Sequence, residues 1–224
     1  MANRSYLYSI DFDLSRQERS DSDKILSIAE WNYNIPIAFK LLLSVRPRKC
    51  PSLLWNYKHP IALVGDYEQG KERLYDFLDD LAKQDMYDHK YLQDCIKLTE
   101  DFLEREDRRQ QYFFMECGEI FDMSSIPLED QNEVLWQQIS NIDDEIKKFY
   151  SEISEINKKI LDKEDELDSA KNKNVLLRIF TGKEDIPALE RELRNLNRDK
   201  YSALGIDNWS EVLYFDFETR KNQD

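Results

Sequence analysis

The sequence is poor in the residues that build disulfide frameworks, metal centres and tight β-turns. Its 224 residues include three cysteines, two histidines, five glycines and six prolines. Cys50, Cys95 and Cys117 are odd in number and widely spaced, so they predict neither a disulfide framework nor a zinc site. The scarcity of glycine and proline disfavours an all-β fold with many turns and favours helices.

Long apolar runs are also missing. The best one, residues 35–45, contains Lys40 and is too short to span a bilayer. The first residues carry Arg4, Asp11 and Asp13 without an apolar stretch, so no signal peptide is expected. Together with the unpaired cysteines, these absences predict a cytoplasmic protein.

Positive charge is in deficit, because 32 basic side chains face 46 acidic ones and the net charge is −14. Such a surface repels nucleic-acid phosphates and anionic membranes, so neither is expected as a partner. It favours a basic protein partner, although solubility alone also explains an acidic surface. Residues 66–107 are the most acidic stretch, with fourteen acidic and six basic side chains.

The hydrophobic pattern predicts an α+β fold. Alternating or buried apolar runs indicate strands at residues 5–12, 61–64, 112–117 and 212–217. Three- and four-residue spacing indicates helices at 69–83 and 87–106, and shorter helices are expected at 25–31 and 36–43. We therefore expect a small, mainly antiparallel sheet with helices packed on one face.

The C-terminal half contains the clearest periodic signal, an apolar seam at alternating four- and three-residue spacing. Nine of its ten positions are apolar: Leu135, Ile139, Ile142, Ile146, Phe149, Ile153, Ile156, Ile160, Lys163 and Leu167. This seam predicts one long helix at 128–172, and a second helix at 185–204 would return along it as an antiparallel coiled-coil hairpin. The seam could instead form a homodimer through residues 135–167, although its flanking charges are not complementary between identical parallel chains.

The predicted elements divide the chain into three parts. Residues 1–126 form an α+β body, and residues 127–205 form the long helical hairpin. Residues 206–224 form a C-terminal strand that returns to the body, followed by a polar tail.

One segment has the spacing of a phosphate-binding loop. Gly65, Gly70 and Lys71 follow an apolar strand and precede a helix. However, Glu72 stands where the motif needs a magnesium-binding hydroxyl, and Asp66 and Glu68 would repel phosphate. A simple turn into a helix is the better interpretation, so no cofactor is expected.

No catalytic or metal-binding constellation is apparent around His59 and His89, the two histidines. The candidate site is instead the outer, acidic side of the helices at 69–83 and 87–106. Its candidate partner-binding residues are Asp76, Asp79, Asp80, Asp94, Asp101 and Glu104.

A second feature of interest is the aromatic density near the N-terminus. Five large rings fall within 27 residues: Trp31, Tyr33, Phe39, Trp55 and Tyr57. They would dominate the core if buried and would anchor an interface if exposed; burial in the core is the expected outcome.

Several N-terminal segments resemble an uncharacterised family of small bacterial proteins. These segments are MANRSYLY at 1–8, EWNYNIP at 30–36, FKLLL at 39–43, CPSL at 50–53 and ALVGDY at 62–67. The resemblance covers the first 80–90 residues and implies a loose association with immunity proteins of bacterial toxin systems. It implies no catalytic residues.

Taken together, these observations predict a non-enzymatic binding protein, specifically a cytoplasmic immunity protein that neutralises a bacterial toxin by occluding a basic surface. One alternative is a coiled-coil scaffold or self-assembling protein. Another is a degenerate nucleotide-binding protein that uses the segment at 65–72.

Overall fold

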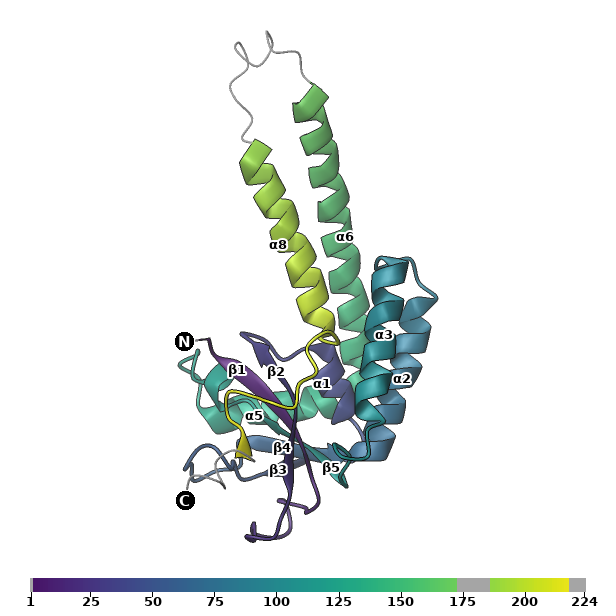
Figure 1. The fold of residues 1–224 in the computed structure, drawn as a ribbon. Coiled ribbons are helices and arrows are strands. Elements are labelled where there is room, and N and C mark those ends of the chain that lie inside the picture. Colours follow the sequence, from purple (N-terminus) through teal and green to yellow (C-terminus); the bar gives the residue numbers. More distant parts are fainter. Residues whose placement is uncertain (1, 173–185, 218–224) are drawn as a thin grey trace.

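The sheet at the centre of the molecule has five strands, all antiparallel. The structure is a computed structural model that describes residues 2–172 and 186–217. The strands are β1 (Arg4–Ile10), β2 (Ile25–Asn32), β3 (Arg48–Cys50), β4 (Ala62–Asp66) and β5 (Tyr112–Glu116). They lie in the order β2-β1-β5-β4-β3, which places β1 and β5 at the centre and makes β2 and β3 the edges (Figure 1).

Both faces of the sheet are apolar. Leu7 of β1 joins the larger core beneath the helices, whereas Tyr6, Tyr8 and Ile10 belong to a second core on the opposite face. This division follows from the two-residue period of a strand. Ser5 and Ser9 are also fully buried, and each satisfies its hydroxyl by donating to a backbone carbonyl, of Asn34 and Arg108 respectively.

Seven helices are present in the described residues. They are α1 (Ile37–Leu42), α2 (Tyr67–Ala82), α3 (His89–Leu103), α4 (Gly118–Phe121), α5 (Leu128–Ser140), α6 (Ile142–Asn172) and α8 (Ile186–Leu204). All seven helices contribute apolar residues to one continuous core, and the contribution of α4 is Phe121. The α+β prediction, with helices packed on one face of an antiparallel sheet, is confirmed.

The structure differs from the prediction at two places in the N-terminal half. Residues 25–31, predicted as a helix, form β2, because pairing with β1 places Ile28 and Ala29 in the core and overrides local propensity. Residues 48–50, for which no element was predicted, form the short edge strand β3.

The expected terminal strand at 212–217 is also absent from the structure. The chain makes a bridge to the sheet just before this segment, Ala29 with Trp209, and then leaves the ladder. The backbone N–H of Tyr214 donates to the Glu30 carboxylate (2.7 Å) instead of to a neighbouring strand. Leu213 and Phe217 nevertheless cover the second core, so the apolar pattern reflects burial without pairing.

The single helix predicted for 128–172 is interrupted at Asn141. The Asn141 side chain donates to the Gln137 carbonyl (2.9 Å), and the backbone departs from helical geometry at φ −111° and ψ 46°. Asparagine competes with the helical ladder through such local bonds. The interruption lets α5 pack against the body, where Trp136 donates to the Pro47 carbonyl, while α6 departs in a new direction (Figure 1).

The two halves of α6 have different neighbours. Phe149 and Ile153 lie in the core of the body, whereas Ile160, Leu167 and Ala170 are buried further along, where α8 lies beside α6 (Figure 1). Lys163 forms an ion pair with Glu192 of α8 (3.1 Å). The predicted connection between the two helices falls on residues 173–185, outside the described residues, as does the apolar segment at 175–180.

Close packing of α1 on α2 generates a stability prediction for Gly70. A Cβ atom at this position would lie 2.0 Å from the carbonyl oxygen of Leu42 and 2.9 Å from its carbonyl carbon. Because both are backbone atoms, Gly70→Ala should force the two helices apart and destabilise the fold by about 2 kcal/mol. The exposed change Glu72→Ala on the same helix should stay within about 0.5 kcal/mol of wild type. Denaturant unfolding measures both, and equal midpoints for the two variants would contradict this packing.

Candidate functional site

The six predicted partner-binding residues lie on the exposed sides of two adjacent helices. Asp76, Asp79 and Asp80 are on α2, Asp94 and Asp101 are on α3, and Glu104 is the C-cap residue of α3. All six are exposed, and α2 and α3 lie side by side (Figure 1). We call this set of six residues the acidic face.

Half of the acidic face is already neutralised within the chain. Asp80 pairs with Lys83 (2.8 Å), Asp101 pairs with Lys97 (2.7 Å) and Glu104 pairs with Lys71 (2.8 Å). The hydrogen bond from Lys71, followed by its charge, holds the pKa of Glu104 below its ordinary value. For Asp76, Asp79 and Asp94, no ion pair is found among residues 2–172 and 186–217. These three carboxylates are therefore available to an external cation.

The segment with phosphate-loop spacing does not form a loop. Gly65 is part of β4 and Gly70 lies inside α2, so the strand leads directly into the helix. Lys71, which would reach a phosphate in such a loop, is buried and paired with Glu68 and Glu104. This arrangement offers no cradle of backbone N–H groups for a phosphate.

The two histidines and three cysteines also lie apart from any common site. His59 is exposed, with its Nε2 atom 3.9 Å from the Glu129 carboxylate, and His89 begins α3. All three cysteines are buried and free. Within the described ranges, no group of three potential metal ligands comes together.

Among the described residues, Glu116 is the most deeply buried carboxylate. It is fully buried in β5 and accepts hydrogen bonds from Ser52 Oγ (2.9 Å) and from the N–H of Leu53 (2.6 Å) and Leu54 (3.3 Å). Burial raises its pKa from 4.5 to about 7, although these hydrogen bonds oppose the rise. Glu116 anchors the loop at 52–54 and lines neither of the two pockets described below, which is the arrangement of a structural residue.

A small pocket of about 290 Å³ lies between α1, α5 and α6. The Lys40 ammonium crosses it to the Glu145 carboxylate (2.8 Å) and also donates to Gln138 (3.1 Å). The hydrogen bonds from Lys148 and Lys40 outweigh burial and lower the pKa of Glu145. These polar groups satisfy one another, which is the pattern of a structural ion pair.

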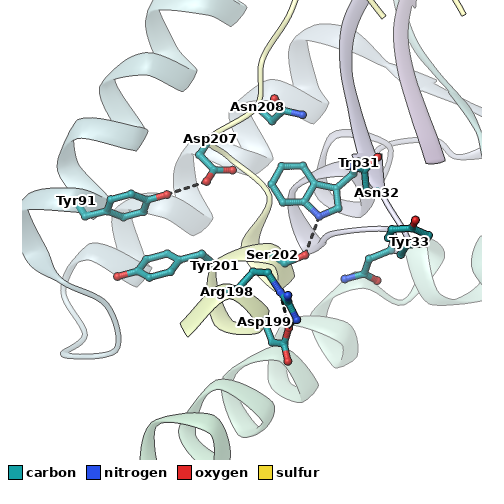
Figure 2. A pocket seen from close by; sticks show the side chains of 11 residues that line it. Trp31, Asn32, Tyr33, Tyr91, Arg198, Asp199, Tyr201, Ser202, Asp207 and Asn208 are labelled. Atoms are coloured by element: carbon teal, nitrogen blue, oxygen red, sulfur yellow. Dashed lines mark hydrogen bonds and ion pairs between the residues drawn. The ribbon is translucent and has the colours of Figure 1, made fainter. Parts of the chain in front are cut away.

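The larger pocket, of about 960 Å³, is an open groove that the sequence did not predict (Figure 2). Its walls come from the end of β2 and the next two residues, from the first turn of α3, from the last turns of α8 and from the segment that follows α8. Its lining side chains are Trp31, Asn32, Tyr33, Asn34, Tyr91, Arg198, Asp199, Tyr201, Ser202, Asp207 and Asn208. We call this pocket the β2 groove.

Hydrogen bonds hold the walls of the β2 groove in place (Figure 2). Trp31 Nε1 donates to Ser202 Oγ (3.0 Å), and the Tyr91 hydroxyl donates to Asp207 (2.8 Å). The rings of Tyr91 and Tyr201 meet edge to face at 4.4 Å. The groove is therefore built from residues about 170 positions apart, and its shape is fixed by side-chain contacts.

The N-terminal aromatic residues have two different fates. Phe39 is fully buried, as predicted for the whole group, but Tyr33 is 60% exposed, and Trp55 and Tyr57 also reach the surface. Tyr33 adopts a left-handed backbone conformation with φ 60°, which turns the chain away at the end of β2. The density of large rings after residue 30 was the one sequence signal of the groove, and its interpretation as core was wrong for most of these rings.

By its fold, the molecule is an α+β protein with a two-sided antiparallel sheet, one helical layer and an open groove at the β2 edge. The chain belongs to the family described as a domain of unknown function, DUF7822, whose sequence model matches residues 13–155. The match begins after β1 and ends within α6, so it extends well past the segments that carry the N-terminal resemblance. No curated protein and no solved structure matches the chain. Across the described residues, no helix is both long and apolar enough to cross a bilayer.

The raised pKa of Glu116 generates a prediction about pH. The folded state holds the proton up to about pH 7, whereas the unfolded state releases it near 4.5. The folded state therefore binds more protons between these values, and the contribution of Glu116 to stability is lost as pH rises from 5 to 8. We expect wild type to lose about 2 kcal/mol relative to Glu116→Gln over this range.

Urea unfolding of both proteins at several pH values measures this difference, and comparison with the variant cancels the titration of all other groups. The exposed change Glu155→Gln on α6 is the matched control, and it should follow wild type at every pH. Parallel stability curves for wild type and Glu116→Gln would show that Glu116 titrates normally.

Proposed function

We propose that this chain is a non-enzymatic binding protein that engages a basic protein surface with the acidic face of α2 and α3. The observation that carries the proposal is the set of three exposed carboxylates, Asp76, Asp79 and Asp94, without an ion-pair partner among the described residues. Exposed charges of one sign accelerate encounter with an oppositely charged partner and disfavour wrong partners.

The local charge balance supports this surface over others. Residues 66–107, which contain α2 and α3, hold fourteen acidic and six basic side chains, whereas residues 1–65 hold six acidic and nine basic ones. The apolar residues of both helices face the core, so the acidic residues are directed outward together. A basic cleft or patch on a protein is the surface that this charge complements.

In its specific form, the proposal is a cytoplasmic immunity protein that blocks a bacterial toxin domain. The resemblance of the N-terminal segments to proteins loosely associated with toxin immunity motivates this partner class. A toxin that acts on nucleic acid must present a basic cleft to phosphates, and an acidic protein can occlude that cleft by charge and shape. The action is inhibition by binding, so it requires no catalytic residue in this chain.

The two alternatives have less support from the geometry. A scaffold assembled through the seam at 135–167 needs that seam to be exposed, yet Leu135, Ile139, Phe149 and Ile153 are buried within the chain. A nucleotide-binding function at 65–72 needs a loop, yet these residues form the junction of β4 and α2.

The experiment is a binding titration against the product of the neighbouring gene. The triple variant Asp76→Asn, Asp79→Asn and Asp94→Asn should weaken binding about ten-fold and flatten its salt dependence between about 50 and 500 mM salt, because screening acts on exposed charge pairs. The matched control is Asp162→Asn, Asp165→Asn and Asp168→Asn, three exposed carboxylates of α6 with the same total charge change. Its affinity should stay within about two-fold of wild type.

Two results would contradict the proposal. Equal weakening by both triple variants would mean that net charge acts without a defined surface. Tight binding with no salt dependence would place the interface on uncharged residues. Light scattering on the isolated chain tests the scaffold alternative separately, since the buried seam predicts a monomer.

A further inference from the structure

The β2 groove contains an open position on the edge of the sheet. β2 is an edge strand, and the chain itself covers the middle of that edge. Trp209 bridges Ala29 in antiparallel fashion, and the N–H of Ser210 donates to the Ile28 carbonyl (2.9 Å). The side-chain amide of Asn208 then donates to the Glu30 carbonyl (2.8 Å), and this coverage stops before Asn32.

The backbone N–H and C=O groups of Asn32 point toward the groove and away from β1. In an antiparallel ladder, opposed residues alternate between pairs that exchange hydrogen bonds and pairs whose N–H and C=O groups point outward. The Glu30 carbonyl points outward, because it bonds to Asn208. Asn32, two residues further along β2, shares this orientation. The N–H of Arg4, which lies opposite Asn32, likewise points away from β2 and donates to Glu119 (2.8 Å). Among residues 2–172 and 186–217 no partner is found for the backbone N–H and C=O of Asn32, so this exposed residue offers one donor and one acceptor in the lining of the groove.

Other side chains that line the groove suit a cationic group. Asp207 and Asp199 supply two exposed carboxylates, and Arg198, which pairs with Asp199 (3.2 Å), neutralises one of them. Tyr91 and Tyr201 add ring faces and edges beside them (Figure 2). The ammonium group of Lys200 already lies 5.9 Å from the centre of the Tyr201 ring, whereas Tyr91 offers its ring beside the Asp207 carboxylate.

We infer that the β2 groove binds an extended polypeptide segment that carries a lysine or arginine side chain. The segment continues the edge of the sheet from where residues 208–210 leave it, and its backbone pairs with the N–H and C=O of Asn32. Its basic side chain lies among Asp207, Asp199 and the two tyrosines. An extended peptide is favoured over a sugar because a peptide backbone can pair with both the N–H and the C=O of Asn32, as a neighbouring strand would, whereas sugar binding does not require a strand edge.

This site goes beyond the proposed function, since it lies at the β2 edge and its test requires no partner of the acidic face. The probe is a capped, fluorescein-labelled hexapeptide of alternating valine and lysine. Its control has identical composition and charge but carries N-methyl groups on its central residues, which removes backbone donors and leaves electrostatic attraction intact. Fluorescence anisotropy against the whole chain measures both peptides.

We expect saturable binding of the first peptide and about ten-fold weaker binding of the N-methylated one, since the net contribution of a hydrogen bond, about 0.5–1.5 kcal/mol, corresponds to a factor of up to about ten. The variant Asn32→Pro should lose a similar factor because proline lacks the N–H. Proline is tolerated at an outward-facing edge position, so thermal unfolding should stay close to wild type.

A charge-matched pair of variants tests the carboxylates. Asp207→Asn keeps an oxygen for the Tyr91 hydroxyl but removes the charge, and it should weaken the lysine peptide about three-fold. Asp162→Asn, exposed on α6 and remote in sequence from the groove, should leave the affinity unchanged.

Three outcomes would overturn the inference. The first is equal affinity for the peptide and its N-methylated control. The second is unchanged binding by a folded Asn32→Pro variant. The third is displacement of the peptide by a neutral oligosaccharide such as cellohexaose, which would identify the groove as a sugar site.

Discussion

The fold depends on shielding both faces of one small sheet from water. β1 and β5 occupy the centre, and their residues alternate between two separate cores. The helices cover only one of these faces. On the other face, Tyr6, Tyr8 and Phe114 are fully buried by segments without regular structure, which contribute Phe12, Leu14, Leu213 and Phe217. Leaving this face exposed would forfeit the burial of several large side chains, each worth about 1.5–3 kcal/mol.

This constraint explains the path of the chain after α8. The segment from residue 206 must cross the edge of the sheet to reach the uncovered face. Thr99 and Trp209 mark the crossing, since Thr99 Oγ1 donates to the Ile206 carbonyl and accepts from Trp209 Nε1 (2.9 Å). The Tyr8 hydroxyl then donates to the Phe215 carbonyl (2.7 Å) on the far side. By covering β2 only as far as Glu30, the same crossing creates the β2 groove.

The acidic face arises from the other side of the same packing. Leu74, Phe77 and Leu78 of α2 belong to the core, and Phe77 meets the ring of Phe149 of α6 edge to face at 5.6 Å. Once these residues are buried, the helical period leaves Asp76 and Asp79 on the outside. The two surfaces therefore have different origins: the acidic face follows from the period of single helices, whereas the groove requires β2, α3, α8 and the crossing segment together.

The sequence by itself determined the features that depend on local periodicity. The stripes of α2 and α3, the seam that forms α5 and α6, the buried strands β4 and β5, and the outward position of all six acidic residues follow from spacing alone. Tertiary structure decided the features in which distant segments compete. Residues 25–32 became a strand because β1 offered a pairing partner, and the interruption at Asn141 lets α5 pack on the body although the apolar seam is continuous. Leu213 and Phe217 are buried as the apolar pattern predicts, but the backbone N–H of Tyr214 donates to the Glu30 carboxylate instead of to a strand. Pairing partners, interruptions and grooves arise from contacts between segments that are distant in the sequence, up to 184 positions apart for Tyr214 with Glu30, and a pattern of near neighbours contains no record of those contacts.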